Sequence, residues 1–137
     1  MTAGHEHDYA GRTALVVDDD PDVLEQLRLF LERLGFRVLT GESQAEGETL
    51  VDGAAPDLCI FDLMMENHDS GFVLSHRMKK KSPLTPVILV TGVAHETGYT
   101  FDAATAEMRR WVKADAVLDK DIRFEQLAAE IARLVQQ

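Results

Sequence analysis

Short apolar runs alternate along the chain with longer segments in which apolar residues recur every three or four positions. The runs predict five strands, which lie at residues 12–17, 36–40, 57–62, 87–90 and 114–118. Uninterrupted apolar runs of this length are typical of strands buried on both faces, as in a parallel sheet covered by helices. The middle run, Leu58–Phe61, is entirely apolar and stops at an acid, Asp62.

The segments between the first three runs predict two helices. The first begins at Pro21, with Asp20 as its N-cap, and ends at Gly35. Proline suits the first turn of a helix, and glycine suits the position just after the last turn. The second helix starts at the capping-box pattern Ser43-Gln44-Ala45-Glu46 and runs to about Asp52.

The second half of the chain predicts two more helices. The third contains Phe72, Val73, His76 and Met78 and ends in the cationic run Lys79–Lys81, which suits the end of a helix. The last helix has a continuous apolar face, formed by Phe124, Leu127, Ala128, Ile131, Leu134 and Val135.

This alternation of strand and helix predicts an α/β fold, a doubly wound five-stranded parallel sheet with right-handed crossovers and helices on both faces. Residues 93–113 show no clear period beyond a helical stretch at 103–111, so an irregular region is expected there. The polar residues 1–11 predict a flexible N-terminal tail, and 12–137 predict one domain.

Composition narrows the class of protein. A net charge of −10 argues against a nucleic-acid-binding surface, which needs a basic stripe. No apolar run is long enough to span a bilayer and no signal peptide is visible, so a cytoplasmic protein without membrane contact is expected. The single cysteine, Cys59, lies inside an apolar run and is expected in the core.

Polar residues follow four of the predicted strands: Asp18 and Asp19, Asp62, Thr91, and Lys120. These strand ends meet at one edge of a doubly wound sheet. Carboxylates about 4 Å apart repel by roughly 4 kcal/mol per pair at an effective dielectric near 20, so either their pKa values rise or a cation joins them. Hard oxygen ligands suit Mg²⁺, and such a site can form an aspartyl phosphate. Taken alone, Asp62 is equally well explained as a turn residue that ends the strand.

The chain resembles the receiver domain of two-component response regulators over nearly its whole length from Arg12. The resemblance is carried by Leu15–Pro21, Pro56–Met65, Pro86–Gly92, and Lys120 followed by a helix. It implies the flavodoxin-like (CheY-like) strand order 2-1-3-4-5, with an irregular region around the fourth helix.

The resemblance also implies a role for each matching residue. Asp62 would accept a phosphoryl group from a histidine kinase or a phosphotransfer protein. Mg²⁺ would be bound by Asp18, Asp19, Asp62 and the backbone carbonyl of Met64, and Thr91 and Lys120 would contact the phosphoryl group. The chain would signal by changing its binding to a downstream protein, with a homodimer as an open alternative. It would not be an enzyme, beyond catalysing its own phosphorylation and slow dephosphorylation.

Several positions depart from the family pattern. Glu66 and Ser70 stand where the family has proline and glycine, and Gly71 comes one residue late, which predicts a longer loop. Asp121 follows Lys120 where the family has a proline, often after a cis bond that a non-proline residue adopts only at a cost of about 2.5–4 kcal/mol.

Other departures leave alternatives open. Val117 replaces an aromatic switch residue, for which Trp111 or Tyr99 would have to substitute. Together with Asp121, it favours a second hypothesis, a pseudo-receiver that binds partners without being phosphorylated. Met64 and Val93 occupy positions that influence water attack in this family; both are apolar, which predicts slow loss of phosphate.

Two further questions concern the class and extent of the protein. An aspartate-nucleophile phosphatase is disfavoured, because that class needs a second aspartate where Met64 stands. We expect a stand-alone switch, although the chain being a piece of a longer protein is an open alternative.

Overall fold

The computed structural model describes residues 9–92 and 114–135 of the chain. Five parallel strands form a single sheet in the order β2-β1-β3-β4-β5, which confirms the predicted fold. The strands are β1 (Thr13–Val17), β2 (Arg37–Gly41), β3 (Leu58–Asp62), β4 (Val87–Thr91) and β5 (Ala116–Asp119). The helices within the described part of the chain are α1 (Pro21–Arg33), α2 (Gln44–Gly53), α3 (Ser70–Lys81) and α6 (Phe124–Leu134).

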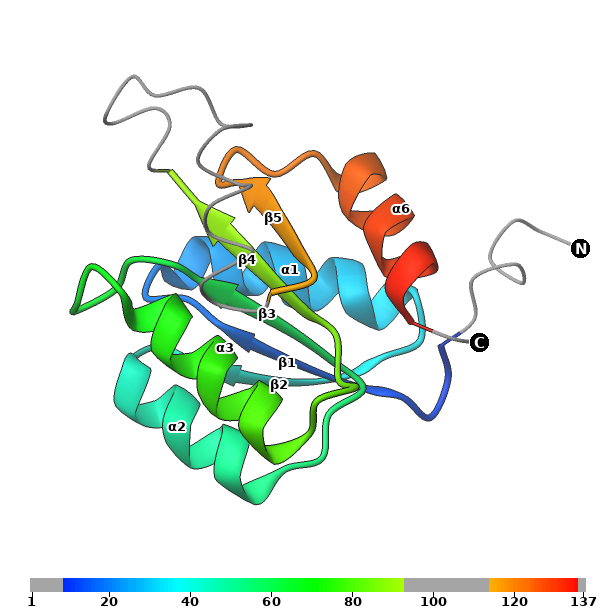
Figure 1. The fold of residues 1–137 in the computed structure, drawn as a ribbon. Helices are drawn as coiled ribbons and strands as arrows, with labels where there is room; N and C mark the ends of the chain where they lie inside the picture. Colours follow the sequence, from blue (N-terminus) through cyan, green and yellow to red (C-terminus); the bar gives the residue numbers. More distant parts are fainter. Residues whose placement is uncertain (1–8, 93–113, 136–137) are drawn as a thin grey trace, which may run out of the picture.

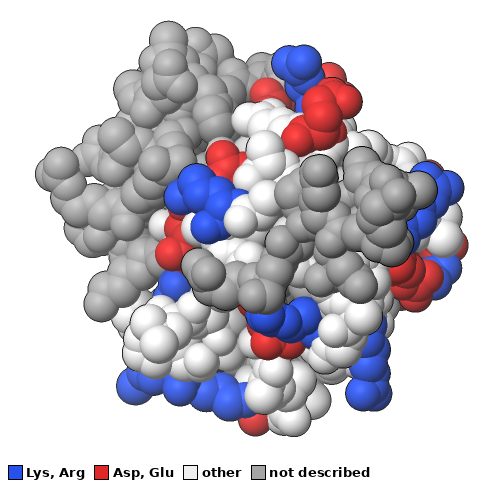
Figure 2. Space-filling view, turned by 90° about the vertical axis from the view of Figure 1, so that its right-hand side faces the viewer, with Lys and Arg blue, Asp and Glu red and all other residues white. Residues whose placement is uncertain are grey.

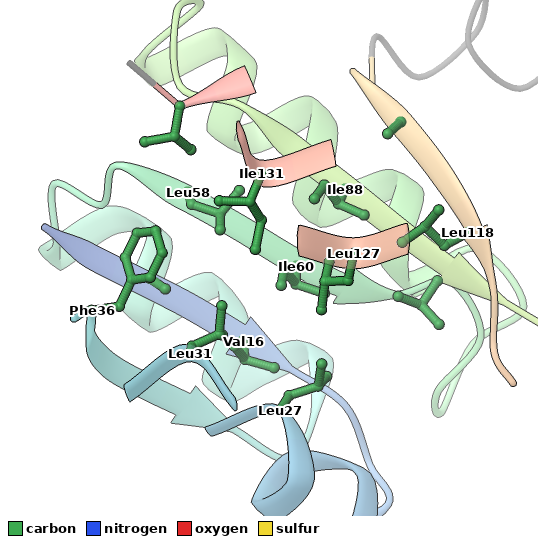
Figure 3. Close-up of a cluster of buried hydrophobic side chains, with 14 of the residues drawn as sticks. Val16, Leu27, Leu31, Phe36, Leu58, Ile60, Ile88, Leu118, Leu127 and Ile131 are labelled. Carbon is green, nitrogen blue, oxygen red and sulfur yellow. The ribbon is translucent and has the colours of Figure 1, made fainter. Parts of the chain in front are cut away.

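The helices cover both faces of the sheet, with α2 and α3 on one side and α1 and α6 on the other (Figure 1). Every residue of β3 and β4 is buried, as their uninterrupted apolar sequences predict. The α1–α6 side holds one apolar cluster, which includes Leu27, Leu31, Leu127 and Ile131 packed on alternate strand residues (Figure 3). A second cluster on the α2–α3 side contains the other alternate strand residues, among them Cys59.

The packed structure includes residues 9–11, which lie before the predicted boundary at residue 12. Tyr9 is buried, stacks on Phe36 with ring centroids 4.8 Å apart, and donates its backbone N–H to the Leu34 carbonyl at 2.9 Å. The chain crosses close over Gly35, which has a φ of 110°; a Cβ there would lie 2.8 Å from the Ala10 nitrogen. Residues 9–11 therefore belong to the packed structure rather than to a tail.

The predicted starts of α1 and α2 are correct. Asp20 caps α1 by accepting from the Asp22 backbone N–H at 2.9 Å. Ser43 caps α2 by accepting from the Glu46 backbone N–H at 3.1 Å. The reciprocal bond of the capping box is displaced by one residue, because the Glu46 carboxylate accepts from the Glu42 N–H at 2.8 Å rather than from Ser43.

The predicted third helix is present as α3, for which the sequence pattern assigned no buried face. Leu74, Ser75 and Met78 are buried, whereas Phe72 and Val73 are half-buried and His76 is exposed. The helix starts at Ser70, within a segment predicted as loop. An apolar pattern does not mark a small polar residue such as Ser70 as buried, so it carries no signal for this start.

The lysines in the last turn of α3 bind neighbouring elements. Lys81 donates to the Val51 and Ala54 carbonyls at the end of α2, at 2.7 and 2.5 Å. Lys79 pairs with Asp115 at 2.6 Å, and Asp115 also accepts from the Val87 backbone N–H. The strand β5 begins at Ala116, two residues later than predicted.

Basic side chains are mostly paired with acids in the described part of the chain. Arg77, for example, lies 2.6 Å from Asp52. On the face shown in Figure 2, lysine and arginine side chains alternate with acidic ones rather than forming one continuous stripe. Within the described ranges, none of the helices has the length and apolar character needed to cross a bilayer.

The region predicted to be irregular, with the helical stretch at 103–111, lies outside the described residues. Val93, Tyr99 and Trp111 lie outside them as well.

Candidate phosphoacceptor site

The carboxyl edge of the sheet gathers four polar strand ends. Asp18 directly follows β1, and Asp62 and Thr91 are the last residues of β3 and β4. Lys120 follows β5. The register aligns Asp62 with Val90 and Thr91 with Asp119, so these ends lie in adjacent rows of one sheet. The convergence that the sequence predicts is therefore found.

Three acids of this edge form a cluster. Within the described residues, one carboxylate oxygen each from Asp18, Asp19 and Asp62 lies within 4.8 Å of the others. Asp18 and Asp62 are buried and Asp19 is exposed. The Asp20 backbone N–H donates to Asp18 Oδ1 at 2.9 Å, which fixes the orientation of that carboxylate.

Lys120 is the cation of the site. Its Nζ donates to Asp62 Oδ2 at 3.0 Å and lies 3.5 Å from Asp18 Oδ1. Its backbone N–H donates to the Thr91 carbonyl at 2.9 Å, which anchors the lysine to the end of β4. Asp121 donates its backbone N–H to Asp119 Oδ1 at 3.1 Å. No peptide bond among the described residues is cis, so the Lys120–Asp121 bond is trans.

Burial of several charges in one place shifts their pKa values. Desolvation, followed by the negative charge of Asp18, raises the pKa of Asp62 from 3.8 to about 6. Desolvation also raises the pKa of Asp18, against the opposing effects of the Asp20 N–H and Lys120. Desolvation lowers the pKa of Lys120, but its hydrogen bond to Asp62 and the surrounding carboxylates outweigh this and raise the pKa overall.

The donor set fits a small divalent cation. Three carboxylates beside one half-buried lysine leave excess negative charge in a partly desolvated site, and hard oxygen ligands suit Mg²⁺. Because Asp19 is exposed, the cluster opens toward solvent on one side. Met64 lies half-buried two residues beyond Asp62, and its carbonyl as a metal ligand stays a prediction.

Gly71 packs directly behind Asp62. A Cβ at this position would lie 2.6 Å from Leu63 Cα and 2.7 Å from the Asp62 carbonyl oxygen. The Gly71 backbone N–H donates to the Leu63 carbonyl at 2.8 Å. The glycine that arrives one position late in the sequence therefore lets α3 approach the backbone of the acidic residue.

Two residues at this edge were not singled out by sequence reasoning. Gln44, in the first turn of α2, accepts hydrogen bonds from the loop after Asp62 and donates its backbone N–H to Glu66. Glu66 had one signal, its place where the family has a proline. Gln44 had none, because a glutamine in a first helical turn is unremarkable.

A family model for the response regulator receiver domain matches residues 14–132 of the chain. Transcriptional regulatory protein GlrR of Escherichia coli is 43% identical over 77 residues, which cover 56% of this chain and 17% of that protein. The transcriptional regulator RpaA of Synechocystis is 27% identical over 127 residues, or 90% of this chain and 48% of that protein. The chain thus spans less than half the length of these curated relatives.

Solved structures agree with the fold. A CheY-like response regulator receiver domain protein from Methanospirillum hungatei superposes with a TM-score of 0.75 at 23% identity. The superposition covers 89% of this chain and 91% of that chain, so the likeness extends over most of both chains.

Proposed function

Since the chain belongs to the response regulator receiver domain family, we propose that it is a phosphoacceptor whose Asp62 takes a phosphoryl group from a histidine kinase or a phosphotransfer protein. The observation that carries the proposal is the cluster of Asp18, Asp19 and Asp62 with Lys120 3.0 Å from Asp62. A turn aspartate that only ended its strand would need neither two further acids nor a lysine.

The proposed step uses an ionised Asp62. One of its carboxylate oxygens attacks the phosphorus of a phosphohistidine while the P–N bond breaks. The bonding electrons leave with the imidazole, and the product is an acyl phosphate on Asp62. Lys120, already within hydrogen-bond reach of Asp62, pairs with the transferred group. Thr91, buried at the end of the neighbouring strand, offers a hydroxyl donor.

Asp18, Asp19, Asp62 and the Met64 carbonyl are the proposed Mg²⁺ ligands. When bound, Mg²⁺ would neutralise the acids and stabilise charge on phosphoryl oxygens. The protein's own contribution is to hold Asp62 in line with the open side of the cluster and to keep Lys120 beside it.

The proposed output is a change in protein binding. A phosphoryl group adds charge at the carboxyl edge, and this biases an equilibrium between two conformations of the surrounding segments. The proposed partners are a kinase or phosphotransfer protein on the input side and a downstream protein on the output side.

The test is Mg²⁺-dependent labelling by acetyl phosphate, followed by intact mass. The wild-type protein should gain one phosphoryl group, and Asp62→Asn should gain none. Asp57→Asn is a matched control, because Asp57 directly precedes the first residue of β3, at the opposite end of the strand from Asp62. Its carboxylate accepts from the Thr13 backbone N–H at 2.8 Å. Normal labelling of Asp62→Asn, or no labelling of the wild type, would refute the proposal; the latter would favour a pseudo-receiver.

Slow hydrolysis of the acyl phosphate is also proposed. Met64 presents a thioether that orients a water only weakly. Replacing Met64 with asparagine or glutamate should speed the loss of phosphate, measured as the decay of the labelled mass after the phosphodonor is removed. Unchanged decay in both variants would contradict this role.

A further inference from the structure

The loop that follows Asp62 is tied to the first turn of α2 by a group of polar side chains. We call this group the α2 strap; it consists of Gln44, Glu66, Asn67 and Ser70. Glu66 and Ser70 are the two positions where the loop departs from the family pattern, so the strap is a feature of this chain's own sequence.

Gln44 is the centre of the strap. Its side-chain oxygen accepts from Asn67 Nδ2 at 2.9 Å and from Ser70 Oγ at 2.8 Å. Its side-chain nitrogen donates to Glu48 Oε2 at 3.0 Å. With donors on one side and a carboxylate on the other, the amide has one orientation that satisfies every partner.

Glu66 adds a charged contact to the same turn. Both of its carboxylate oxygens lie 3.0 Å from the Gln44 backbone nitrogen, which donates to them. This backbone hydrogen bond lowers the pKa of Glu66. The carboxylate therefore occupies the positive end of α2, where an anion is favoured.

The strap matters because the loop has few other restraints. Leu63 is held by two backbone hydrogen bonds: its N–H donates to the Val90 carbonyl, and its carbonyl accepts from the Gly71 N–H. Between Met64 and Asp69, the Met65 backbone N–H donates to the Asn67 carbonyl at 3.1 Å, and residues 66–69 are exposed. The conformation of the loop that carries Met64 thus depends on the side-chain contacts of the strap farther along the loop.

We propose that Gln44 is a positioning residue for the acidic site, holding the loop so that the Met64 carbonyl faces the cation. This inference rests on the proposed function, because it assigns that carbonyl to Mg²⁺. Gln44 makes no hydrogen bond to Asp18, Asp19 or Asp62, and it acts on the site through the loop.

The experiment compares two variants, each of which removes contacts at one end of the packed pair α2 and α3. Gln44→Met removes the acceptor at the site end. Lys81→Met removes the lysine that binds the Val51 and Ala54 carbonyls at the far end. Gln44→Glu keeps an acceptor for Asn67 and Ser70 but loses the donor to Glu48, so it serves as the intermediate variant.

Mg²⁺ affinity is measured by calorimetry, and acetyl phosphate labelling is measured over a range of Mg²⁺ concentrations. For Gln44→Met, the Mg²⁺ concentration at half-maximal labelling and the calorimetric Kd should both rise about tenfold, as for other outer-shell partners of metal ligands. The rate at saturating Mg²⁺ should change little. Lys81→Met should match the wild type in Mg²⁺ dependence, and Gln44→Glu should recover part of the loss.

Amide hydrogen exchange of the metal-free proteins gives a readout that is independent of phosphorylation. Residues 64–69 should exchange faster in Gln44→Met and not in Lys81→Met. If the wild type binds Mg²⁺ and is labelled while Gln44→Met shows the same affinity, the positioning role alone is wrong. If the wild type neither binds Mg²⁺ nor is labelled, the proposed function fails and this inference fails with it.

Discussion

Asp62 is an acid in surroundings that disfavour its charge. Its pKa is raised from 3.8 to about 6, so the folded state binds the proton more tightly than the unfolded state does. Between these two values the folded state holds more protons, and the free energy of unfolding therefore falls as the pH rises. The cost of ionisation is fully present above about pH 6. A shift of this size corresponds to roughly 1–3 kcal/mol.

Asp62→Asn should therefore stabilise the metal-free protein at neutral pH by about 1–3 kcal/mol. The asparagine oxygen still accepts from Lys120, while the repulsion from Asp18 is removed. Urea unfolding in a chelator at several pH values is the measurement, with Asp57→Asn as the control. The gain should shrink as the pH falls from 7 toward 4, and a gain that grew in acid would show the sign to be wrong.

A second prediction for a single residue concerns Gly71. A Cβ there would meet the backbone of Leu63 and Asp62 at 2.6 and 2.7 Å, and backbone atoms yield less easily than a flexible side chain. Gly71→Ala should destabilise the domain by about 1–3 kcal/mol, the range for overpacking. Its labelling by acetyl phosphate should also slow, because Asp62 itself is displaced. Gly53→Ala is the matched control, since no atom lies within 4 Å of a Cβ there.

Single residues differ in how visible their roles are in the sequence. Asp18, Asp62 and Lys120 each follow an apolar strand, and the topology of a doubly wound sheet brings such positions together. Gln44 lies in the first turn of α2 and Glu66 in the loop after β3, and their contact depends on how a lengthened loop folds. That is a tertiary detail for which neither periodicity nor spacing carries a signal.

At the level of elements, the sequence predicted each strand that the structure describes and missed the start of α3. β3 and β4 are apolar up to their last residues, so their assignment did not depend on the phase of an alternating pattern. α3 starts at Ser70 and Gly71, which are buried but carry no hydrophobic signal. The start of β5 was placed two residues too early, although Asp115 still bonds to β4 by donating its backbone N–H to the Val87 carbonyl at 2.8 Å.

Lys79 connects three of these elements. Its Nζ contacts Asp115 at 2.6 Å and the Thr85 carbonyl at 2.8 Å, so it joins the end of α3 to the loop before β4 and to the start of β5. The lysine side chain is only 11% exposed. Such a partly buried pair is costly to break from one side, because the remaining charge loses its partner.

Lys79→Met should destabilise the domain by about 2–4 kcal/mol, close to the range for removing one partner of a buried pair. The neighbouring variant Lys80→Met is the control, since Lys80 is exposed and should change stability by less than about 0.5 kcal/mol. Thermal and urea unfolding measure both. Equal stability of the two variants would mean that the Lys79–Asp115 pair contributes nothing net.

At the level of the whole molecule, the proposed Mg²⁺ site should couple folding to metal binding. A ligand that binds only the folded state stabilises it by RT ln(1 + [L]/Kd), about 2.7 kcal/mol at one hundred times Kd. Mg²⁺ should therefore raise the Tm of the wild type, and Asp19→Asn should reduce that rise. Asp19 is exposed, so this variant removes a proposed ligand without disturbing the core.

The same coupling should depend on pH. Protons and Mg²⁺ compete for Asp62, whose pKa is about 6 in the metal-free site, so Mg²⁺ stabilisation should be large at pH 7.5 and weak at pH 5. Asp62→Asn should be more stable than the wild type in a chelator. In Mg²⁺ it should gain less stability than the wild type does. A Tm series with and without Mg²⁺ at the two pH values tests this. If the wild type gained equally at both pH values, the cation would be binding away from Asp62.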